Sequence, residues 1–186
     1  MISGKCVVNV ESVMSPSQTS TTPTSVSTID YRPPSVEDGR RLWEIASDSQ
    51  VLDVNSPFAY VLWCHDFAAT SIVAEIDGRP IGFVTGYQRP DNPAVLMVWQ
   101  VAVDHAARGN GVAATMLHKL FLRCASAGMV AMHTTISPDN EASQRLFASV
   151  AAARGLELRR QDLFDAALFP DAHQPEQLYR LEAPVL

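Results

Sequence analysis

The residues with the clearest chemical potential form a short turn that contains two glycines, Arg108-Gly109-Asn110-Gly111. The turn follows the apolar run 95–104 and precedes a segment in which apolar residues recur at helical spacing. Backbone N–H groups at the start of a helix point outward, the helix dipole favours negative charge there, and glycine lets a ligand approach the backbone closely. The pattern therefore predicts an anion site that suits a pyrophosphate, although a tight turn without a ligand has the same residues.

Two common nucleotide-binding signatures are absent from the chain. The sequence has no G-x-x-x-x-G-K-[ST], which a nucleotide P-loop requires, and no complete G-x-G-x-x-G of a dinucleotide-binding fold. The predicted anion site is therefore of another kind.

The composition excludes several classes of partner. The 186 residues carry a formal net charge of −6 and a pI near 5.3, whereas nucleic acids and anionic membranes attract clustered Lys and Arg. No apolar run approaches the roughly 20 residues that span a bilayer. The cysteines and histidines are scattered, without the spacing of a disulfide framework or a metal site. We therefore expect a cytoplasmic protein that binds a small molecule, with no nucleic acid, membrane or metal as partner.

The length of the chain favours one domain, preceded by a leader. Nearly every residue from Ser15 to Thr28 is Ser or Thr, so this stretch has little to bury in a core. We expect residues 1–28 to form a disordered leader and residues 29–186 to form one folded domain.

The hydrophobic pattern of residues 29–186 mixes strands with helices. We expect strands near 29–32, 71–75, 81–87, 95–104, 129–136, 156–163 and 178–181, and helices that begin after Ser35, Ser56, Gly111 and Asn140. Asp77-Gly78 supplies the positive φ angles of a hairpin turn. The run 95–104 is too apolar for an exposed strand, so we expect it at the centre of the sheet. This order predicts an α/β (α+β) fold in which helices flank a mixed sheet.

The helix after Ser56 has a clear beginning. Pro57 fits its first turn, and Phe58, Val61 and Leu62 recur at helical spacing. We expect this helix to end around His65-Asp66.

Two motifs carry a resemblance to a known family. The segment 108–113 resembles the R-x-x-G-x-G/A signature of the GNAT N-acetyltransferases, and 140–143 (NEAS) is similar to the N-x-x-A that begins the family's next helix. The resemblance implies acetyl-CoA as co-substrate and a mostly antiparallel sheet of six to seven strands with about four helices. It assigns coenzyme contacts to Val101, Val103, Arg108, Gly109, Asn110, Gly111, Val112, Ala113 and Asn140.

Four longer blocks carry a narrower resemblance. Segments 52–62, 98–104, 134–143 and 173–181 resemble the diaminobutyrate acetyltransferases of ectoine biosynthesis, a response to osmotic stress. The resemblance implies transfer of acetyl to the 4-amino group of a small diamine, L-2,4-diaminobutyrate, by a homodimer.

The narrower resemblance also implies a substrate pocket formed by Asp53, Phe58, Trp99 and Glu176. Carboxylates suit the two ammonium groups of the diamine, and an aromatic face accepts a cation or packs against methylene groups. Phe58 stands where this family usually has Tyr. Without the resemblance, ordinary structural roles are the favoured explanation for Asp53, Trp99 and Glu176.

The catalytic roles follow from the chemistry of the amine, which must lose a proton before it attacks a thioester. Glu176 is the first candidate base, with Asp53 as orienting anion. Many GNAT enzymes protonate the leaving thiolate with a Tyr, but Phe147 occupies that position here, which leaves solvent, Tyr179 or the low basicity of the thiolate. We expect His133 to be structural.

Two alternatives remain at this level. One is a GNAT enzyme that acts on a different amine. The other is a catalytically silent acyl-CoA sensor, which the missing Tyr favours.

Overall fold

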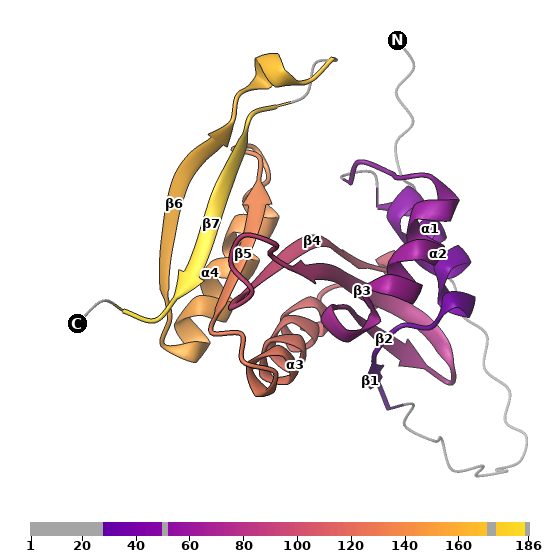
Figure 1. Ribbon diagram of the computed structural model, residues 1–186. Coiled ribbons are helices and arrows are strands. Elements are labelled where there is room, and N and C mark those ends of the chain that lie inside the picture. Colours follow the sequence, from indigo (N-terminus) through magenta and orange to yellow (C-terminus); the bar gives the residue numbers. More distant parts are fainter. Residues whose placement is uncertain (1–27, 50–51, 171–173, 185–186) are drawn as a thin grey trace, which may run out of the picture.

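A computed structural model of the protein describes residues 28–49, 52–170 and 174–184 (Figure 1). Seven strands form one sheet in the order β1-β2-β3-β4-β5-β7-β6. All neighbouring strands are antiparallel except β4 and β5, which are parallel. The strands are β1 (Asp30–Arg32), β2 (Ile72–Ile76), β3 (Arg79–Gln88), β4 (Val95–Val103), β5 (Ala131–Ile136), β6 (Glu157–Phe164) and β7 (Glu176–Glu182). The predicted leader lies outside the described residues except for residue 28, and it stays a prediction.

Helices cover both faces of the sheet. The α-helices of the described residues are α1 (Gly39–Asp48), α2 (Pro57–Asp66), α3 (Val112–Ser126) and α4 (Glu141–Arg154). On one face, Leu42 of α1 and Tyr60 of α2 belong to the same core cluster as Phe83 of β3. On the other face, α3 and α4 contribute Leu117 and Phe147 to a larger cluster. The predicted fold class is therefore confirmed.

None of the helices in the described part of the chain combines the length and the apolar character that crossing a membrane requires.

The predicted order of strands and helices is also the observed one. The hairpin between β2 and β3 turns at Asp77 and Gly78, whose φ angles are 50° and 77°, as the sequence predicts. β4 is the central strand of the sheet.

β4 and β5 diverge after a short paired stretch. Their pairing begins at Val95 and ends at Val98 of β4. Beyond this point β4 continues to Val103 along β3, whereas β5 continues to Ile136 along β7. The sheet therefore opens beside the second half of β4, and the turn before α3 follows at the end of that strand.

Trp99 occupies an irregular position in β4. Thr85 of β3 pairs with Gln100 and the next residue, Gly86, pairs with Val98, so Trp99 is the extra residue of a β-bulge. Trp99 is 50% exposed, whereas Val98 and Gln100 are buried. A Cβ at Gly86 would lie 2.9 Å from two backbone carbonyl oxygens. Glycine therefore permits the close approach of chains at the bulge.

α2 begins and ends as predicted, and the Ser56 side chain caps its first turn. The residues whose spacing predicts the helix are nevertheless exposed: Phe58 is 71%, Val61 39% and Leu62 40% exposed. The buried side chains of the helix include Tyr60. Because α2 is apolar on most sides, its spacing identifies a helix without identifying the face that packs inward.

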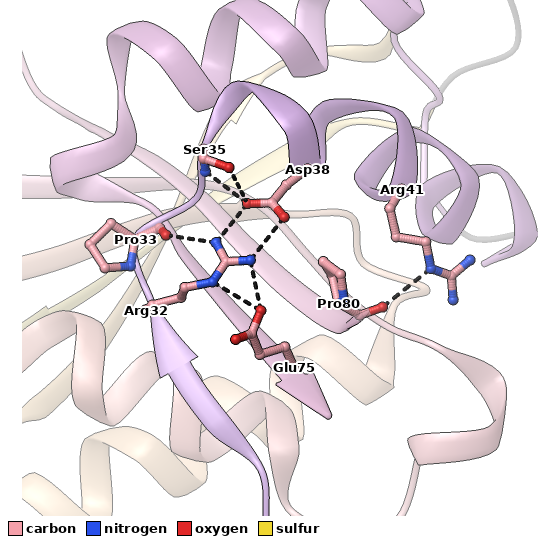
Figure 2. Close-up of polar contacts among 7 residues, drawn as sticks. All are labelled: Arg32, Pro33, Ser35, Asp38, Arg41, Glu75 and Pro80. Atoms are coloured by element: carbon pink, nitrogen blue, oxygen red, sulfur yellow. Dashed lines mark hydrogen bonds and ion pairs between the residues drawn. The ribbon is translucent and has the colours of Figure 1, made fainter. Parts of the chain in front are cut away.

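A partly buried ion-pair network fixes the start of α1 against the sheet (Figure 2). The Arg32 guanidinium lies 2.7 Å from a carboxylate oxygen of Asp38 and 2.7 Å from one of Glu75. Asp38 also accepts a hydrogen bond from the Ser35 N–H at 2.7 Å. The hydrogen bond to Asp38 is the main reason why the pKa of Arg32 is raised. The network joins β1, the short 3-10 helix before α1, and β2.

Candidate active site

A cleft of about 440 Å³ lies where β4 and β5 diverge, which is a typical size for a small-molecule site. Its walls come from the end of α1, the second half of β4, the turn before α3, and the first turns of α3 and α4. The lining residues are Ser49, Leu52, Val101, Ala102, Val103, Ala107, Arg108, Gly109, Gly111, Val112, Ala113, Ala114, Asn140, Ala142, Ser143 and Leu146.

All the residues that the sequence predicts as coenzyme contacts line this cleft, except Asn110. Asn110 instead shapes the turn, because its side-chain amide donates to the carbonyl oxygens of Ala107 and Arg108 at 3.3 Å. Sequence reasoning missed the small and apolar residues of the walls, such as Leu52 and Leu146. Such residue types carry no chemical signal of their own.

The turn before α3 exposes backbone donors. Gly109 and Gly111 have φ angles of 80° and 70°, a conformation that residues with a Cβ rarely adopt. The residue at the N-cap of α3, Gly111, offers no side chain to cap the helix. The first N–H groups of α3 therefore lack the usual side-chain acceptor and are available to an anion in the cleft.

Contacts of Asp104 and Arg108 hold the segment that leads into this turn. The Arg108 Nε donates to the carbonyl oxygen of Val103 at 3.0 Å, while Asp104 accepts from the Ala106 N–H at 3.1 Å. Arg41 of α1 forms an ion pair with Asp104 and donates to a backbone carbonyl in β3. Burial of Asp104 acts to raise its pKa, but the Ala106 N–H and Arg41 outweigh burial, so the pKa is lowered. Asp104 therefore stays ionised and fixes the start of the turn.

The backbone of β4 presents hydrogen-bonding groups to the cleft. The Asp104 N–H donates to Ile81 of β3 at 2.8 Å. Backbone groups alternate between the two sides of a strand, so those of Val103 and Val101 point away from β3. This geometry places their peptide groups on the edge of β4 beside the opening.

Gln100 ties the segment that carries Asp53 to the strand that carries Trp99. The Gln100 Nε2 donates to the backbone carbonyl oxygen of Asp53 at 2.8 Å, so the segment before α2 is tied to β4 beside Trp99. The indole of Trp99 stacks on that of Trp63 in α2, with ring centroids 5.7 Å apart and planes inclined by 26°. One face of the Trp99 ring is therefore packed on Trp63, and the other face is free in the described part of the chain. Trp99 lies beside the coenzyme cleft, since Val101 and Ala102 of the same strand line that cleft.

The other two predicted substrate residues, Phe58 and Glu176, do not line the coenzyme cleft. Phe58 is exposed in the first turn of α2. Glu176 is the first residue of β7 and pairs with Phe164 of β6, while the next residue pairs with Ile136 at the end of β5. Glu176 therefore lies at the sheet edge that carries the carboxyl end of β5, across the opening from β4. It does not line the coenzyme cleft.

Three further residues have structural positions. The His133 Nε2 lies 2.8 Å from a carboxylate oxygen of Glu182, and burial is the main reason why the pKa of His133 is lowered. Phe147 is buried in the core under α4, in the same cluster as Tyr179. The hydroxyl of Tyr179 has no hydrogen-bond partner among the described residues, and Tyr179 does not line the cleft.

Sequence reasoning missed a polar group around Trp99 that includes Tyr60, Trp63, Thr85 and Gln100, which line a second, smaller cavity with it. The available signal was Gly86, because a glycine inside a strand often marks a bulge. In the described part of the chain, no three His, Cys, Asp or Glu side chains gather as metal ligands do.

Relatives of this chain include two proteins named L-2,4-diaminobutyric acid acetyltransferase. The one from Streptomyces coelicolor is 58% identical over 151 residues, which are 80% of this chain and 89% of the relative. The one from Nocardia farcinica is 52% identical over 160 residues, which are 86% of this chain and 82% of the relative.

Solved structures with the same fold include the diaminobutyrate acetyltransferase EctA from Paenibacillus lautus, in complex with its substrate L-2,4-diaminobutyric acid and coenzyme A. EctA is 37% identical with a TM-score of 0.80, and the match covers 84% of this chain and 95% of EctA. Ard1 from Thermoplasma volcanium, at 16% identity and a TM-score of 0.67, shares the fold. The profile of the acetyltransferase (GNAT) family matches residues 39–151, a span that includes the glycine turn and Asn140. The chain therefore belongs to the GNAT family of acetyltransferases.

Proposed function

We propose that this enzyme transfers the acetyl group of acetyl-CoA to the 4-amino group of L-2,4-diaminobutyrate, which gives N4-acetyl-2,4-diaminobutyrate for ectoine synthesis. The observation that carries the proposal is the cleft between β4 and α4, with its glycine turn at one end and the Gln100–Asp53 contact next to Trp99 in sequence. The names of the relatives from Streptomyces coelicolor and Nocardia farcinica, and the ligands of EctA, support the same substrate.

The lining of the cleft fits acetyl-CoA. The N–H groups at the start of α3 and the Arg108 guanidinium suit the pyrophosphate. The peptide groups of Val101 and Val103 on the open edge of β4 suit the amides of the pantetheine arm, which pairs with them like an added strand. We assign to an N–H of the same edge the stabilisation of the negative charge that develops on the thioester oxygen during attack.

The diamine carries two ammonium groups and one carboxylate. We assign the carboxylates of Asp53 and Glu176 to its ammonium groups and the free face of Trp99 to its methylene groups. Phe58 belongs to the same region by its position in the first turn of α2, and it contributes apolar surface. The 4-amine then faces the thioester, while the 2-amine and the carboxylate are anchored away from it.

The proton balance follows from this arrangement. Glu176 accepts a proton from the 4-ammonium, and Asp53 orients the diamine. The neutral amine attacks the thioester carbonyl and a C–N bond forms, after which the nitrogen releases its second proton to solvent. The C–S bond breaks as the tetrahedral intermediate collapses to the amide. The coenzyme leaves as a thiolate, which takes a proton from solvent, since Phe147 has none to give and Tyr179 does not line the cleft.

We also assign the enzyme to the cytoplasm and to a homodimer. Large apolar side chains are exposed on the β6 strand and on the short helix after it, at the end of the β6–β7 hairpin that extends past β5 in Figure 1: Leu163 is 37%, Phe164 46% and Leu168 69% exposed. Association with a second copy would cover such exposed apolar side chains. Light scattering of the purified protein measures the mass directly.

The function is tested by the release of coenzyme A with a panel of amines. Diaminobutyrate is expected to give turnover far above a polyamine, an aminoglycoside or a peptide with a free N-terminus. A second amine that exceeds diaminobutyrate would assign the enzyme to another substrate. Binding of acetyl-CoA without turnover of any amine would instead make the protein an acyl-CoA sensor.

A further inference from the structure

A second, much smaller cavity lies behind Trp99. It is lined by Asn55, Ala59, Tyr60, Trp63, Thr85, Trp99 and Gln100. The cavity volume is about 10 Å³, which is about the volume that one water molecule requires.

Three of the lining residues carry a buried polar atom that has no hydrogen-bond partner among the described residues: the Tyr60 hydroxyl, the Trp63 indole N–H and the Thr85 hydroxyl. The residues Tyr60 and Thr85 are each only 2% exposed, so bulk solvent does not satisfy them. Buried polar groups without partners destabilise a protein, and they are normally paired with protein groups or with ordered water. Three residues that line one cavity and each carry such an atom point to a shared ligand.

The chemistry of the lining identifies that ligand. The Trp63 indole can only donate a hydrogen bond, so it disfavours an ammonium group, which can also only donate. No Lys, Arg, Asp or Glu lines the cavity, so a buried ion would have no opposite charge there. A water molecule accepts from Trp63, exchanges hydrogen bonds with the hydroxyls of Tyr60 and Thr85, and fits the space.

We propose that this cavity binds a single water molecule, and that Tyr60, Trp63 and Thr85 act through it as positioning residues for Trp99. The role of Trp99 rests on the proposed function, in which its free face packs against the diamine. Trp63 contacts both the cavity and the Trp99 ring. Gln100 lines the cavity and holds the backbone of Asp53. The water therefore links the aromatic stack to the segment that carries Asp53.

The first test is a high-resolution crystal structure of the full-length enzyme. The expected result is electron density for one water molecule within hydrogen-bonding distance of the Tyr60 hydroxyl, the Trp63 indole N–H and the Thr85 hydroxyl. A cavity without density, or direct hydrogen bonds among these three groups, would overturn the proposal. This result does not depend on which amine the enzyme acetylates, so it is separable from a failure of the proposed function.

The second test is a double-mutant cycle with Tyr60→Phe and Thr85→Val, which remove the hydroxyls and keep the shapes. Each single variant is expected to raise the KM for diaminobutyrate about fivefold and to leave the KM for acetyl-CoA unchanged. Because both act through one water, the double variant should also show about a fivefold rise. A multiplicative rise of about 25-fold, or an equal change in both KM values, would contradict a shared water.

The matched control is Tyr31→Phe in β1, which makes the same chemical change in a residue that lines neither cavity. The ring of Tyr31 keeps its contact with Lys119 in this variant, since that contact is to the ring face. Both KM values should stay as in the parent enzyme. A rise in the KM for diaminobutyrate with this control would mean that loss of a Tyr hydroxyl acts through general stability, which would remove the kinetic support for the water site.

Discussion

The Gln100 side chain donates a hydrogen bond from Nε2 to the backbone carbonyl oxygen of Asp53, at 2.8 Å and across 47 positions of sequence. It connects the central strand of the sheet to the irregular segment that precedes α2. Since Trp99 is the neighbour of Gln100, this contact ties the segment that carries Asp53 to the strand that carries Trp99.

Replacement of this contact should weaken the binding of the amine selectively. Gln100→Leu keeps most of the side-chain volume and removes the donor, so we expect the KM for diaminobutyrate to rise about tenfold while the KM for acetyl-CoA stays constant. The control is Gln88→Leu, which removes an exposed hydrogen bond of 2.7 Å to the Pro93 carbonyl. Equal kinetics for the two variants would show that the Asp53 segment does not need this anchor.

The glycine turn should be sensitive to substitution because of its backbone conformation, and not because a side chain would be crowded there. A Cβ at Gly111 would meet no atom within 4 Å, but its φ of 70° costs a residue with a side chain about 1–2 kcal/mol. Gly111→Ala is expected to raise the KM for acetyl-CoA about tenfold, because relief of that strain moves the N–H groups of the turn. The matched control is Gly128→Ala, because Gly128 has a φ of 92° and a Cβ there would also meet no atom within 4 Å. This variant should lower stability without a change in either KM.

Asp104 should matter for the coenzyme although it does not line the cleft. Asp104→Ala removes the acceptor for the Ala106 N–H and the partner of Arg41, so we expect a rise of about fivefold in the KM for acetyl-CoA. The control is Asp165→Ala, which removes the same kind of cap, an oxygen 2.9 Å from the Ala167 N–H. Asp165 does not line the cleft. Comparable KM values for both variants would contradict a positioning role for Asp104.

The network around Asp38 should make stability depend on pH. Burial of Asp38 acts to raise its pKa, but the hydrogen bonds from Arg32 and from the Ser35 N–H outweigh burial, so the pKa is lowered. The stabilisation is therefore complete above the unfolded-state pKa of about 4 and is lost as the pH falls through the lowered folded-state pKa. Asp38→Asn should lower the free energy of unfolding by about 2 kcal/mol at neutral pH and by less in acid.

Urea unfolding at several pH values measures this difference. The control is Asp91→Asn, because Asp91 also pairs with an arginine but its side chain is 66% exposed, against 7% for Asp38. Exposed pairs contribute little, so this variant should resemble the parent protein at every pH. A constant difference between parent and Asp38→Asn across the whole range would show that the carboxylate charge is not what stabilises the network.

The fold could be predicted from the sequence because its signals are local. The hairpin turn at Asp77-Gly78 and the caps at Ser56 and Asn140 each depend on a few neighbouring residues, and the structure has them where predicted. The strand that begins at Glu176 is longer than predicted, since residues 176 and 177 are polar and carry no strand pattern. Pairing with β5 and β6 extends the strand to these two residues, although their sequence does not predict it.

The site could be predicted only in part, because its substrate half depends on contacts between distant segments. The turn at 108–113 is contiguous, so its residues fall together in one cleft. The group around Trp99 joins Tyr60 of α2 to Thr85 of β3 across a bulge, and a bulge leaves no pattern beyond a glycine. The same limit applies to α2, whose buried face is decided by the shape of the surface that it packs against.

The central claim is the transfer of acetyl to one nitrogen of diaminobutyrate, and the most direct measurement is the NMR spectrum of the product. A site that pairs both ends of the substrate with fixed groups should reject the wrong amine steeply. We expect the acetyl group on the 4-nitrogen only, butylamine as a very poor substrate, and Glu176→Gln with reduced turnover and unchanged binding of acetyl-CoA. Acetylation of both nitrogens to an equal extent, or turnover of butylamine as fast as that of diaminobutyrate, would contradict the claim.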